Sequence, residues 1–259
     1  MHTFLRIVSR PLVLVGIPVA LLLSTVFPAA ATAEVPTDPP VFSNPLEITN
    51  VWAPFQEGGV KVFRGKLDGQ RLVVTELHLS ETRFFSWSGG TAETRIVKEL
   101  EFVDGVLEEV AWEFFAQADD GTVYQFGELV DEYEDGEVAG HEGSWLVGGA
   151  QKRSDPPGTA AAPRPTILMP AVPEVGDEFK PEDLYPIVDE TVLILDVNKR
   201  AQVPAGRFNG LLKLRETSEL PDSVPERKWV AAGVGVIRTR SSEETLLLIS
   251  TNLEPAEER

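Results

Sequence analysis

Alternation of apolar and polar residues marks a series of short segments along the chain. In the first half these segments are rich in Val, Leu, Phe and Thr, which favour extended strands, and Asx-Gly or Gly-Gly turns separate them. No long segment keeps the i, i+3, i+4, i+7 spacing of an amphipathic helix, and a single helical turn is expected at residues 181–185. The pattern predicts an all-β, antiparallel, hairpin-rich fold. The expected strands span residues 60–66, 71–79, 95–102, 109–118 and 122–126.

The two halves of the chain repeat the same order of elements. The stretch SGGTAETRIVKELEF (88–102) is similar to PAGRFNGLLKLRETS (204–218), a Gly-containing turn that leads into a strand. WEFFAQADDGTVYQF (112–126) is similar to ERKWVAAGVGVIRTR (226–240), and a further strand precedes each pair. Few residues are identical, but the shared order of elements predicts a duplicated unit.

This duplication sets the expected domain boundaries. Residues 45–150 form the first β repeat and residues 166–259 the second, and residues 151–165 (QKRSDPPGTAAAPRP) are interpreted as an exposed linker. Each repeat would present a sheet with one apolar face that must be covered. The two similar halves are therefore expected to form one compact domain, either a sandwich or an incompletely closed barrel. A cavity between the sheets is the expected place for a ligand.

The first 33 residues have the features of a secretory signal peptide. Two arginines precede an apolar run at residues 11–27, and a small-x-small pattern ends at Ala33. An uncleaved signal anchor is the alternative, because a run of this length can just span a bilayer. Cleavage near Ala33 predicts a secreted or periplasmic protein without stable membrane insertion, whose residues 34–44 (EVPTDPPVFSN) form a flexible leader.

Charge narrows the range of partners. Without the first 33 residues the chain has 226 residues, with 21 Lys and Arg against 41 Asp and Glu and a net charge of −20. Such a charge repels nucleic acid and anionic membrane surfaces, so neither is an expected partner. The chain contains no cysteine, so its stability must come from a buried core and not from disulfides. The oligomeric state stays open.

Several blocks of the sequence resemble those of a known group of proteins. The core FVDGVLEEVAWEFFAQADDGTVYQFGE (102–128) resembles the W-x-F-A-Q-x-x-D-G-x-V-x-x-F-G-E block of a group of uncharacterised secreted bacterial all-β proteins. The resemblance implies no activity or cofactor. Two features depart from the group: Gln125 stands where the group has an aromatic residue, and the Pro-rich stretch near Pro156 has the character of an insertion. Further similar blocks are EYEDG (132–136), EGSW (142–145), ILMPAVPEVGDEF (167–179) and AAGVGVI (231–237).

Few residues point to catalysis by a nucleophile or a metal. Beyond the signal only His78 and His141 remain, and two distant histidines without cysteine do not make a zinc site of known spacing, so both are interpreted as structural or surface residues. Ser88 and Ser144 lack the G-x-S-x-G context of an activated serine. Carboxylate catalysis stays open, but it requires two carboxylates on converging strands, and the many Asp and Glu residues do not single out a pair.

Acidic residues offer a weak alternative in the form of a calcium site. Asp119 and Asp120 in one turn, with Glu134 in the acidic run at residues 131–137, carry the hard oxygen ligands that calcium prefers. The run lacks the D-x-[DN]-x-[DN]-G loop, and Asp-Gly is equally demanded by turn geometry. We therefore expect no metal and no other cofactor.

Residues 111–128 place five aromatic residues around this acidic turn, and the hairpin register decides where they face. If Asp120-Gly121 is a two-residue loop, aromatic residues lie on both faces of the hairpin, as in a ligand-lined wall. If Gly121 is instead a bulge after a type I turn, Ala118 pairs with Thr122 and one face gathers four aromatic residues. We favour the second register, because it separates an aromatic face from a polar one. The four residues are Trp112, Phe114, Tyr124 and Phe126.

In the favoured register the other face carries Glu113, Phe115 and Gln117, followed by Val123 and Gln125. Phe115 is the exception on this face, since it is an aromatic residue between two polar ones. The three residues Glu113, Phe115 and Gln117 are therefore the candidate ligand-binding residues.

Three functions are consistent with these patterns. The first is a non-enzymatic binding module for an apolar or mixed small ligand, held in a cavity or on an open face. The second is a carboxylate-dependent extracellular hydrolase of the glycan type, which requires a buried, convergent carboxylate pair. The third is a structural or envelope-interaction domain, which would have a filled core and an exposed apolar patch. The missing nucleophile and metal motifs favour the first.

Overall fold

The computed structural model describes residues 35–256 and contains no helix within that range. Fifteen β-strands form one sheet. The strands of the first half are β1 Val60–Leu67, β2 Gln70–Trp87, β3 Gly90–Val103, β4 Val106–Gln117, β5 Val123–Glu134, β6 Glu137–Gly140, β7 Trp145–Val147 and β8 Ala160–Ala162. Those of the second half are β9 Thr166–Met169, β10 Glu178–Leu184, β11 Val188–Val203, β12 Gly206–Thr217, β13 Glu226–Ala231, β14 Gly235–Arg240 and β15 Glu244–Thr251.

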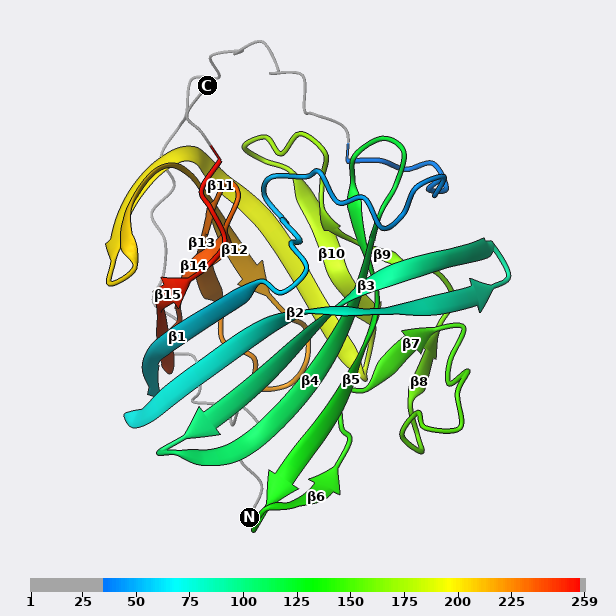
Figure 1. Ribbon diagram of the computed structural model, residues 1–259, viewed down its shortest axis with the longest axis horizontal. Coiled ribbons are helices and arrows are strands. Elements are labelled where there is room, and N and C mark those ends of the chain that lie inside the picture. The colour runs from blue at the N-terminus through cyan, green and yellow to red at the C-terminus, as the bar shows by residue number, and fades with distance from the viewer. Residues whose placement is uncertain (1–34, 257–259) are drawn as a thin grey trace, which may run out of the picture.

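The sheet curls into a barrel-like shape that is not fully closed (Figure 1). Its order is β10-β11-β12-β13-β14-β15-β1-β2-β3-β4-β5, so the antiparallel pairing of β15 with β1 joins the second half to the first. The open seam lies between β10 and the paired strands β5 and β9. Among the strands of residues 35–256, only β7 and β8 pair in parallel. The predicted all-β fold is confirmed, with the form of an incompletely closed barrel and not of a sandwich.

Asx-Gly pairs form the tight turns of two predicted hairpins, β1–β2 and β3–β4. Asp68 and Gly69 have φ angles of 49° and 85°, and Asp104 and Gly105 have φ angles of 50° and 91°. Two successive residues with positive φ make a type I′ turn, whose twist matches that of paired strands. Asp tolerates the first position and Gly fills the second without steric cost.

The helical turn expected at residues 181–185 is wrong. Glu182, Asp183 and Leu184 lie in β10 and pair with residues 188–190 of β11. The neighbouring strand supplies backbone partners, and this tertiary pairing outweighs a weak local preference.

The favoured register of the β4–β5 hairpin is confirmed at the turn. The Ala118 amide donates to the Thr122 carbonyl at 2.9 Å, and Gly121 has a φ of 90°. Further along, Phe114 lies opposite Gly127 and not opposite Phe126, because a bulge shifts the register between Phe114 and Phe115.

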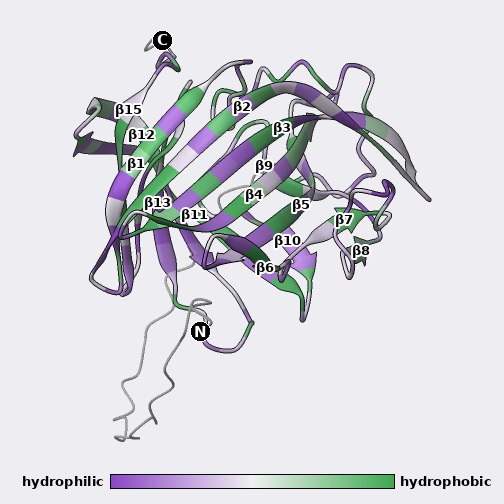
Figure 2. Cartoon of the chain, turned by 60° about the horizontal axis from the view of Figure 1, so that its bottom comes forward, coloured by the Kyte–Doolittle hydropathy of each residue, from purple (hydrophilic) through white to green (hydrophobic). Residues whose placement is uncertain are grey.

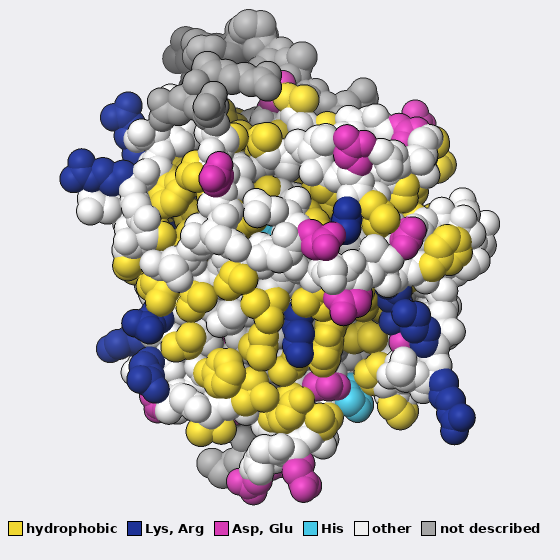
Figure 3. All heavy atoms as spheres, viewed as in Figure 1, with side chains coloured by type: hydrophobic (Ala, Val, Ile, Leu, Met, Phe, Trp, Pro, Cys, Tyr) yellow, Lys and Arg dark blue, Asp and Glu magenta, His cyan; other side chains and the backbone are white. Residues whose placement is uncertain are grey.

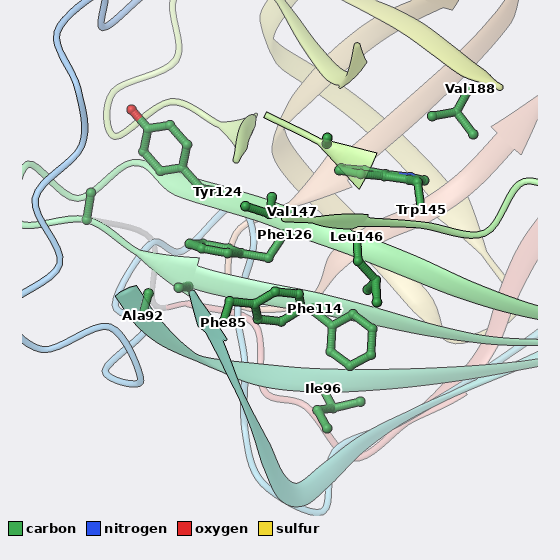
Figure 4. Packing of buried hydrophobic residues seen from close by; sticks show 13 residues of the cluster. Phe85, Ala92, Ile96, Phe114, Tyr124, Phe126, Trp145, Leu146, Val147 and Val188 are labelled. Atoms are coloured by element: carbon green, nitrogen blue, oxygen red, sulfur yellow. The ribbon is translucent and has the colours of Figure 1, made fainter. Parts of the chain in front are cut away.

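An aromatic cluster covers the outer side of this hairpin (Figure 4). Phe114, Tyr124 and Phe126 lie in it, and the short strand β7 and the β8 residue Ala162 pack against them. Phe85 of β2 meets the rings of Phe114 and Phe126, each at a centroid distance of 5.4 Å. The four aromatic residues expected on one face thus share one cluster, with Trp112 at its partly buried edge.

The segments on either side of the first repeat contact this cluster too. Phe42, in the predicted leader, packs edge-on against Tyr124 and Phe126. Asp155, in the predicted linker, forms a two-point ion pair with Arg83 of β2 at 2.8 Å. Both segments therefore contribute to the packing around the cluster.

Both proposed repeats contain a four-strand meander, β2–β5 in the first and β11–β14 in the second. The similar stretches 88–102 and 204–218 cover nearly all of β3 and the whole of β12, the second strand of each meander. The duplication itself stays a prediction. The predicted signal peptide, residues 1–33, lies outside the described residues. No helix in the described range is long and apolar enough to cross a membrane.

Candidate functional site

A cavity of about 470 Å³ lies inside the barrel. Inward-facing residues of β1–β5 and β9–β15 line it, together with residues of the segment 48–55 that precedes β1. Ligand pockets in proteins measure about 300–1,000 Å³, so a small molecule of moderate size fits this space. Figure 2 shows hydrophilic and hydrophobic residues alternating along β2, β3 and β4. Because successive side chains of a strand point to opposite faces, one set of them lines the cavity.

Most of the polar residues that line the cavity are acidic. Two lysines, Lys61 and Lys228, and one histidine, His78, also line it, whereas neither aspartate nor arginine does. Because side chains alternate across a strand, Glu99 and Glu101 both point inward from β3. The nine lining glutamates are Glu76, Glu99, Glu101, Glu113, Glu182, Glu190, Glu216, Glu226 and Glu244.

Several glutamates of this lining face another glutamate directly across the sheet. Glu182 of β10 lies opposite Glu190 of β11, and Glu216 of β12 lies opposite Glu226 of β13. Within the β4–β5 hairpin, Glu113 of β4 lies opposite Glu128 of β5. Like charges that are directly opposed destabilise a sheet, so this arrangement has an energetic cost.

Lys228 compensates part of this charge. Its Nζ lies 2.7 Å from Glu216 and 3.8 Å from Glu190. Burial opposes the charged form of Glu216, but Lys228 and the hydrogen bond with Glu190 outweigh it, so the pKa of Glu216 is lowered. Burial and the neighbouring Glu216 raise the pKa of Glu190 well above its usual value. The two carboxyls therefore share a hydrogen bond in which Glu190 holds the proton.

Lys61 and His78 occupy another part of the lining. Lys61 pairs with Glu76 at 2.7 Å. Burial and the nearby Lys61 lower the pKa of His78 to about 4, so the ring is neutral at pH 7. His78 accepts a hydrogen bond from the Gln56 amide at 3.1 Å and stacks on Phe55 at 4.9 Å. His78 thus anchors the segment that precedes β1, in line with the structural role expected for it.

Glu99, Glu101 and Glu113 differ from these paired glutamates. No ion pair joins any of the three to a residue in the described range, and their nearest charged neighbours include other glutamates. Burial, followed by the charges around them, raises the pKa of Glu101 and Glu113 to about 7 and that of Glu99 well above its usual value. At neutral pH Glu101 and Glu113 therefore change their protonation easily.

The structure separates the three candidate ligand-binding residues. Glu113 and Phe115 line the cavity, and Phe115 packs beside Val97 and Val123. Gln117 is not part of the lining: its Oε1 accepts hydrogen bonds from the amides of Thr49 and Asn50, both at 2.8 Å. Gln117 therefore fastens the segment before β1 to the end of β4.

The weak metal alternative does not come together as a site. Asp119 accepts hydrogen bonds from the amide and hydroxyl of Ser43, at 2.8 and 2.7 Å, and Asp120 accepts one from the Thr122 amide at 2.8 Å. These turn residues precede β5, whereas Glu134 ends it. Among the residues that the structure describes, no group of three acidic or histidine side chains is arranged to hold a metal ion.

Sequence reasoning missed most of the acidic lining, including Glu99, Glu190 and Glu216. The sequence contains one indication of this lining, since Val97, Glu99 and Glu101 occupy every second position along β3. Alternation shows that they share a face, but it does not show that this face is the inside of a barrel. The residues became a group only when strands distant in the sequence closed around one space.

Comparisons with known proteins give no information about the function of the cavity. No protein-family model and no curated protein sequence matches the chain. Among solved structures, the chain is similar to a suspected lipoprotein of Parabacteroides distasonis, with 13% sequence identity and a TM-score of 0.34. That similarity covers 78% of this chain and 99% of the other. A likeness this remote carries no argument about function, and the resemblance to secreted bacterial all-β proteins stays a prediction.

Proposed function

We propose that the protein is an exported binding module that holds a small molecule inside its barrel. The observation that carries this proposal is the cavity of about 470 Å³ with both apolar and polar walls. Ligand pockets combine a mostly apolar wall with a few polar groups that fix orientation. A structural domain would gain stability by filling this space with side chains.

One part of the apolar wall lies where the β4–β5 hairpin meets the segment before β1. Phe115 and Val123, from the two strands of the β4–β5 hairpin, form a buried cluster with Val97 of β3. Ile48 and Phe55, from the segment before β1, pack against this cluster. An apolar part of a ligand would bind here, and its polar part would face the glutamates.

Native mass spectrometry of the protein purified from its own source tests this proposal. We expect a small molecule to remain bound to the folded protein and to be absent after denaturation. The Val97→Trp variant, which fills the cavity, should lose it, whereas the Phe84→Trp variant, changed at an exposed site on β2, should keep it. Retention of the same molecule by Val97→Trp would place binding elsewhere and contradict the proposal.

A second candidate is a carboxylate-dependent hydrolase, and one observation favours it. Glu190 and Glu216 share a hydrogen bond with their pKa values moved in opposite directions, the arrangement that separates an acid from a base. Glycosidases hold their carboxyls about 5–9.5 Å apart so that a sugar carbon or a water fits between them. Two carboxyls in direct contact leave no such room, which makes binding the better-supported function.

Hydrolysis assays on glycan and ester substrates, with Glu216→Gln as the matched variant, decide between the two. Turnover by the wild-type protein that Glu216→Gln abolishes would establish the hydrolase. Ligand retention without turnover would leave binding as the function.

A further inference from the structure

The carboxyl groups in the cavity outnumber its cationic groups. Lys61 and Lys228 are both engaged, with Glu76 in one case and with Glu216 and Glu190 in the other. Glu99, Glu101 and Glu113 have no cationic partner in the described part of the chain. Burial of a carboxylate without a partner is costly, and the opposed glutamate pairs add to this cost.

An unpaired amide gives a second, independent indication of a ligand. Gln125 is 4% exposed and lines the cavity, and its side chain makes no hydrogen bond to any described residue. Its polar atoms are not among the fully enclosed side-chain atoms that lack a partner, so the amide opens onto the cavity and can form a hydrogen bond there. A ligand with a polar group at this place would supply the missing partner.

The amide, the apolar wall and the unpaired carboxyls are neighbours on the sheet. Gln125 of β5 lies directly opposite Phe115 of β4. Glu113 is two residues from Phe115 on the same face of β4, and it lies opposite Val97 of β3. Glu99 follows Val97 on the same face of β3. One molecule of modest length can therefore contact the amide, the aromatic ring and the carboxyls at the same time.

We propose that the ligand is a small organic cation, with its protonated amine between Glu99 and Glu113 and its apolar body against Phe115 beside the Gln125 amide. This inference rests on the binding function proposed above and specifies its ligand class. An ammonium group supplies several hydrogen-bond donors and a positive charge, which these carboxyls lack from the protein. The apolar wall and the absence of a three-ligand metal cluster among residues 35–256 favour an organic cation over a metal ion.

Binding of a cation should depend on pH, because the carboxyls must be ionised to attract it. Glu113 is surrounded by carboxyls from four other strands and by two lysines, and its burial together with these carboxyls opposes its ionisation without a ligand. A bound ammonium favours the ionised form, and the amine should therefore bind more tightly at pH 8 than at pH 6 and should release protons on binding. The facing groups are Glu76 of β2, Glu99 of β3, Glu128 of β5, Glu182 of β10, Lys61 of β1 and Lys228 of β13.

Isothermal titration of the mature chain with three probes of matched shape tests the inference. The probes are 4-phenylbutylamine, 4-phenylbutanol and 4-phenylbutanoate, which present a cation, a neutral group and an anion on the same apolar body. At pH 8 we expect the amine to bind at least about tenfold more tightly than the alcohol, the anion to bind most weakly, and the amine preference to shrink at pH 6.

Variants locate the effect within the cavity. Glu99→Gln combined with Glu113→Gln should remove most of the amine preference, and Gln125→Leu should weaken the amine and the alcohol alike. Glu137→Gln, at an exposed position of β6, is the matched control and should change nothing. Circular dichroism verifies that each variant is folded. If the double variant does not fold, Glu99→Gln and Glu113→Gln are tested separately.

The outcomes separate this inference from the binding function. Equal or tighter binding of the alcohol or the anion would overturn the cation class and leave a binding module in place. An amine preference that survives the Glu99→Gln and Glu113→Gln exchange would also overturn it. Failure of all three probes to bind, together with an empty protein in native mass spectrometry, would reject both.

Discussion

The two faces of the β4–β5 hairpin have opposite characters. On the outer face, Phe114 and Phe126 lie in a cluster that β7 and the β7–β8 region cover, and the Arg83 guanidinium over Phe114 has its own carboxylate in Asp155. On the inner face, Phe115 stands beside Glu113 and Gln125, which have neither an ion pair nor a side-chain hydrogen bond among the described residues. The outer face, whose side chains are closely packed and whose charges are paired, stabilises the fold. The inner face, which borders a cavity and carries polar groups without partners, is suited to binding a ligand.

The outer surface of the sheet shows that apolar residues alone do not mark a site. Figure 3 shows hydrophobic side chains gathered over the region of β2–β5. On the outer face of β4, Trp112 is partly buried, and Lys98 of β3 lies over its ring with Nζ 4.9 Å from the centroid. An aliphatic stem and a cation over an aromatic ring cover apolar surface without any partner protein.

Truncation of the outer aromatic cluster should have the largest effect on stability. Phe126 is fully buried, so Phe126→Ala should lower the free energy of unfolding by about 4 kcal/mol, as is usual for a buried phenylalanine. Urea denaturation measures the loss. Phe84→Ala, at a ring that is 59% exposed, is the control and should cost well under about 1 kcal/mol. Equal losses in the two variants would contradict the assignment of the cluster as core.

Removal of the buried arginine should have the next largest effect. The side chains of Arg83 and Asp155 are 4% and 1% exposed, so Arg83→Met leaves a carboxylate buried without its partner. We expect a loss of about 3 kcal/mol in the free energy of unfolding, measured in urea. Arg64→Met, at an exposed position of β1, should be nearly neutral. A loss below about 1 kcal/mol in Arg83→Met would show that the pair adds little.

The inner face should make the protein less stable at alkaline than at mildly acidic pH. Burial raises the pKa of Glu101, Glu113, Glu182 and Glu244 to about 7, above the value of about 4.5 for a free glutamate. The folded state then binds more protons than the unfolded state between these values, so stability falls as the pH rises through this window. We expect roughly 1–3 kcal/mol less stability at pH 8 than at pH 5, measured by urea denaturation at each pH.

The opposite trend with pH would contradict this account of the inner face. Asp155 does not disturb this comparison. Despite its burial, Arg83 and backbone amides lower its pKa, so its ionisation makes stability rise with pH only at values more acidic than pH 5.

Neutralisation of one inner carboxyl should have the smallest effect, in the opposite direction to the first two. Glu113→Gln removes a charge that faces Glu128 across the sheet, and it should raise the free energy of unfolding at pH 8 by about 1 kcal/mol. The same variant should bind 4-phenylbutylamine more weakly, so stability and binding should change in opposite directions. Glu137→Gln again serves as the control, and a destabilised Glu113→Gln would show that this carboxyl supports the fold.

Local rules predicted the strands, the turns and the division of the hairpin into two faces. The Asp-Gly turns follow from the backbone preferences of the two residues, and the bulge at Gly121 from the separation of aromatic and polar positions. The pairing of Phe114 with Gly127 was not predictable in this way. It depends on β7, because a Cβ at Gly127 would lie 2.4 Å from the Trp145 carbonyl oxygen.

The candidate site was accessible to sequence reasoning only in part. Phe115 stood out because its aromatic ring broke a polar pattern, and the alternation of side chains placed Glu113 on the same face. Gln117 obeyed the same alternation but lies beyond the edge of the cavity, where it binds Thr49 and Asn50 of a segment whose path no periodicity describes.

By itself the sequence determined that this chain forms antiparallel hairpins and which residues of each strand share a face, because strand periodicity and turn chemistry are local properties. Only the tertiary structure decided which of those faces became the inside. Curling of the sheet brings Glu99 of β3, Glu190 of β11 and Lys228 of β13 around one space. Electrostatic coupling between such residues depends on distance through space and not along the chain, and so the acidic character of the cavity exists only in the folded barrel.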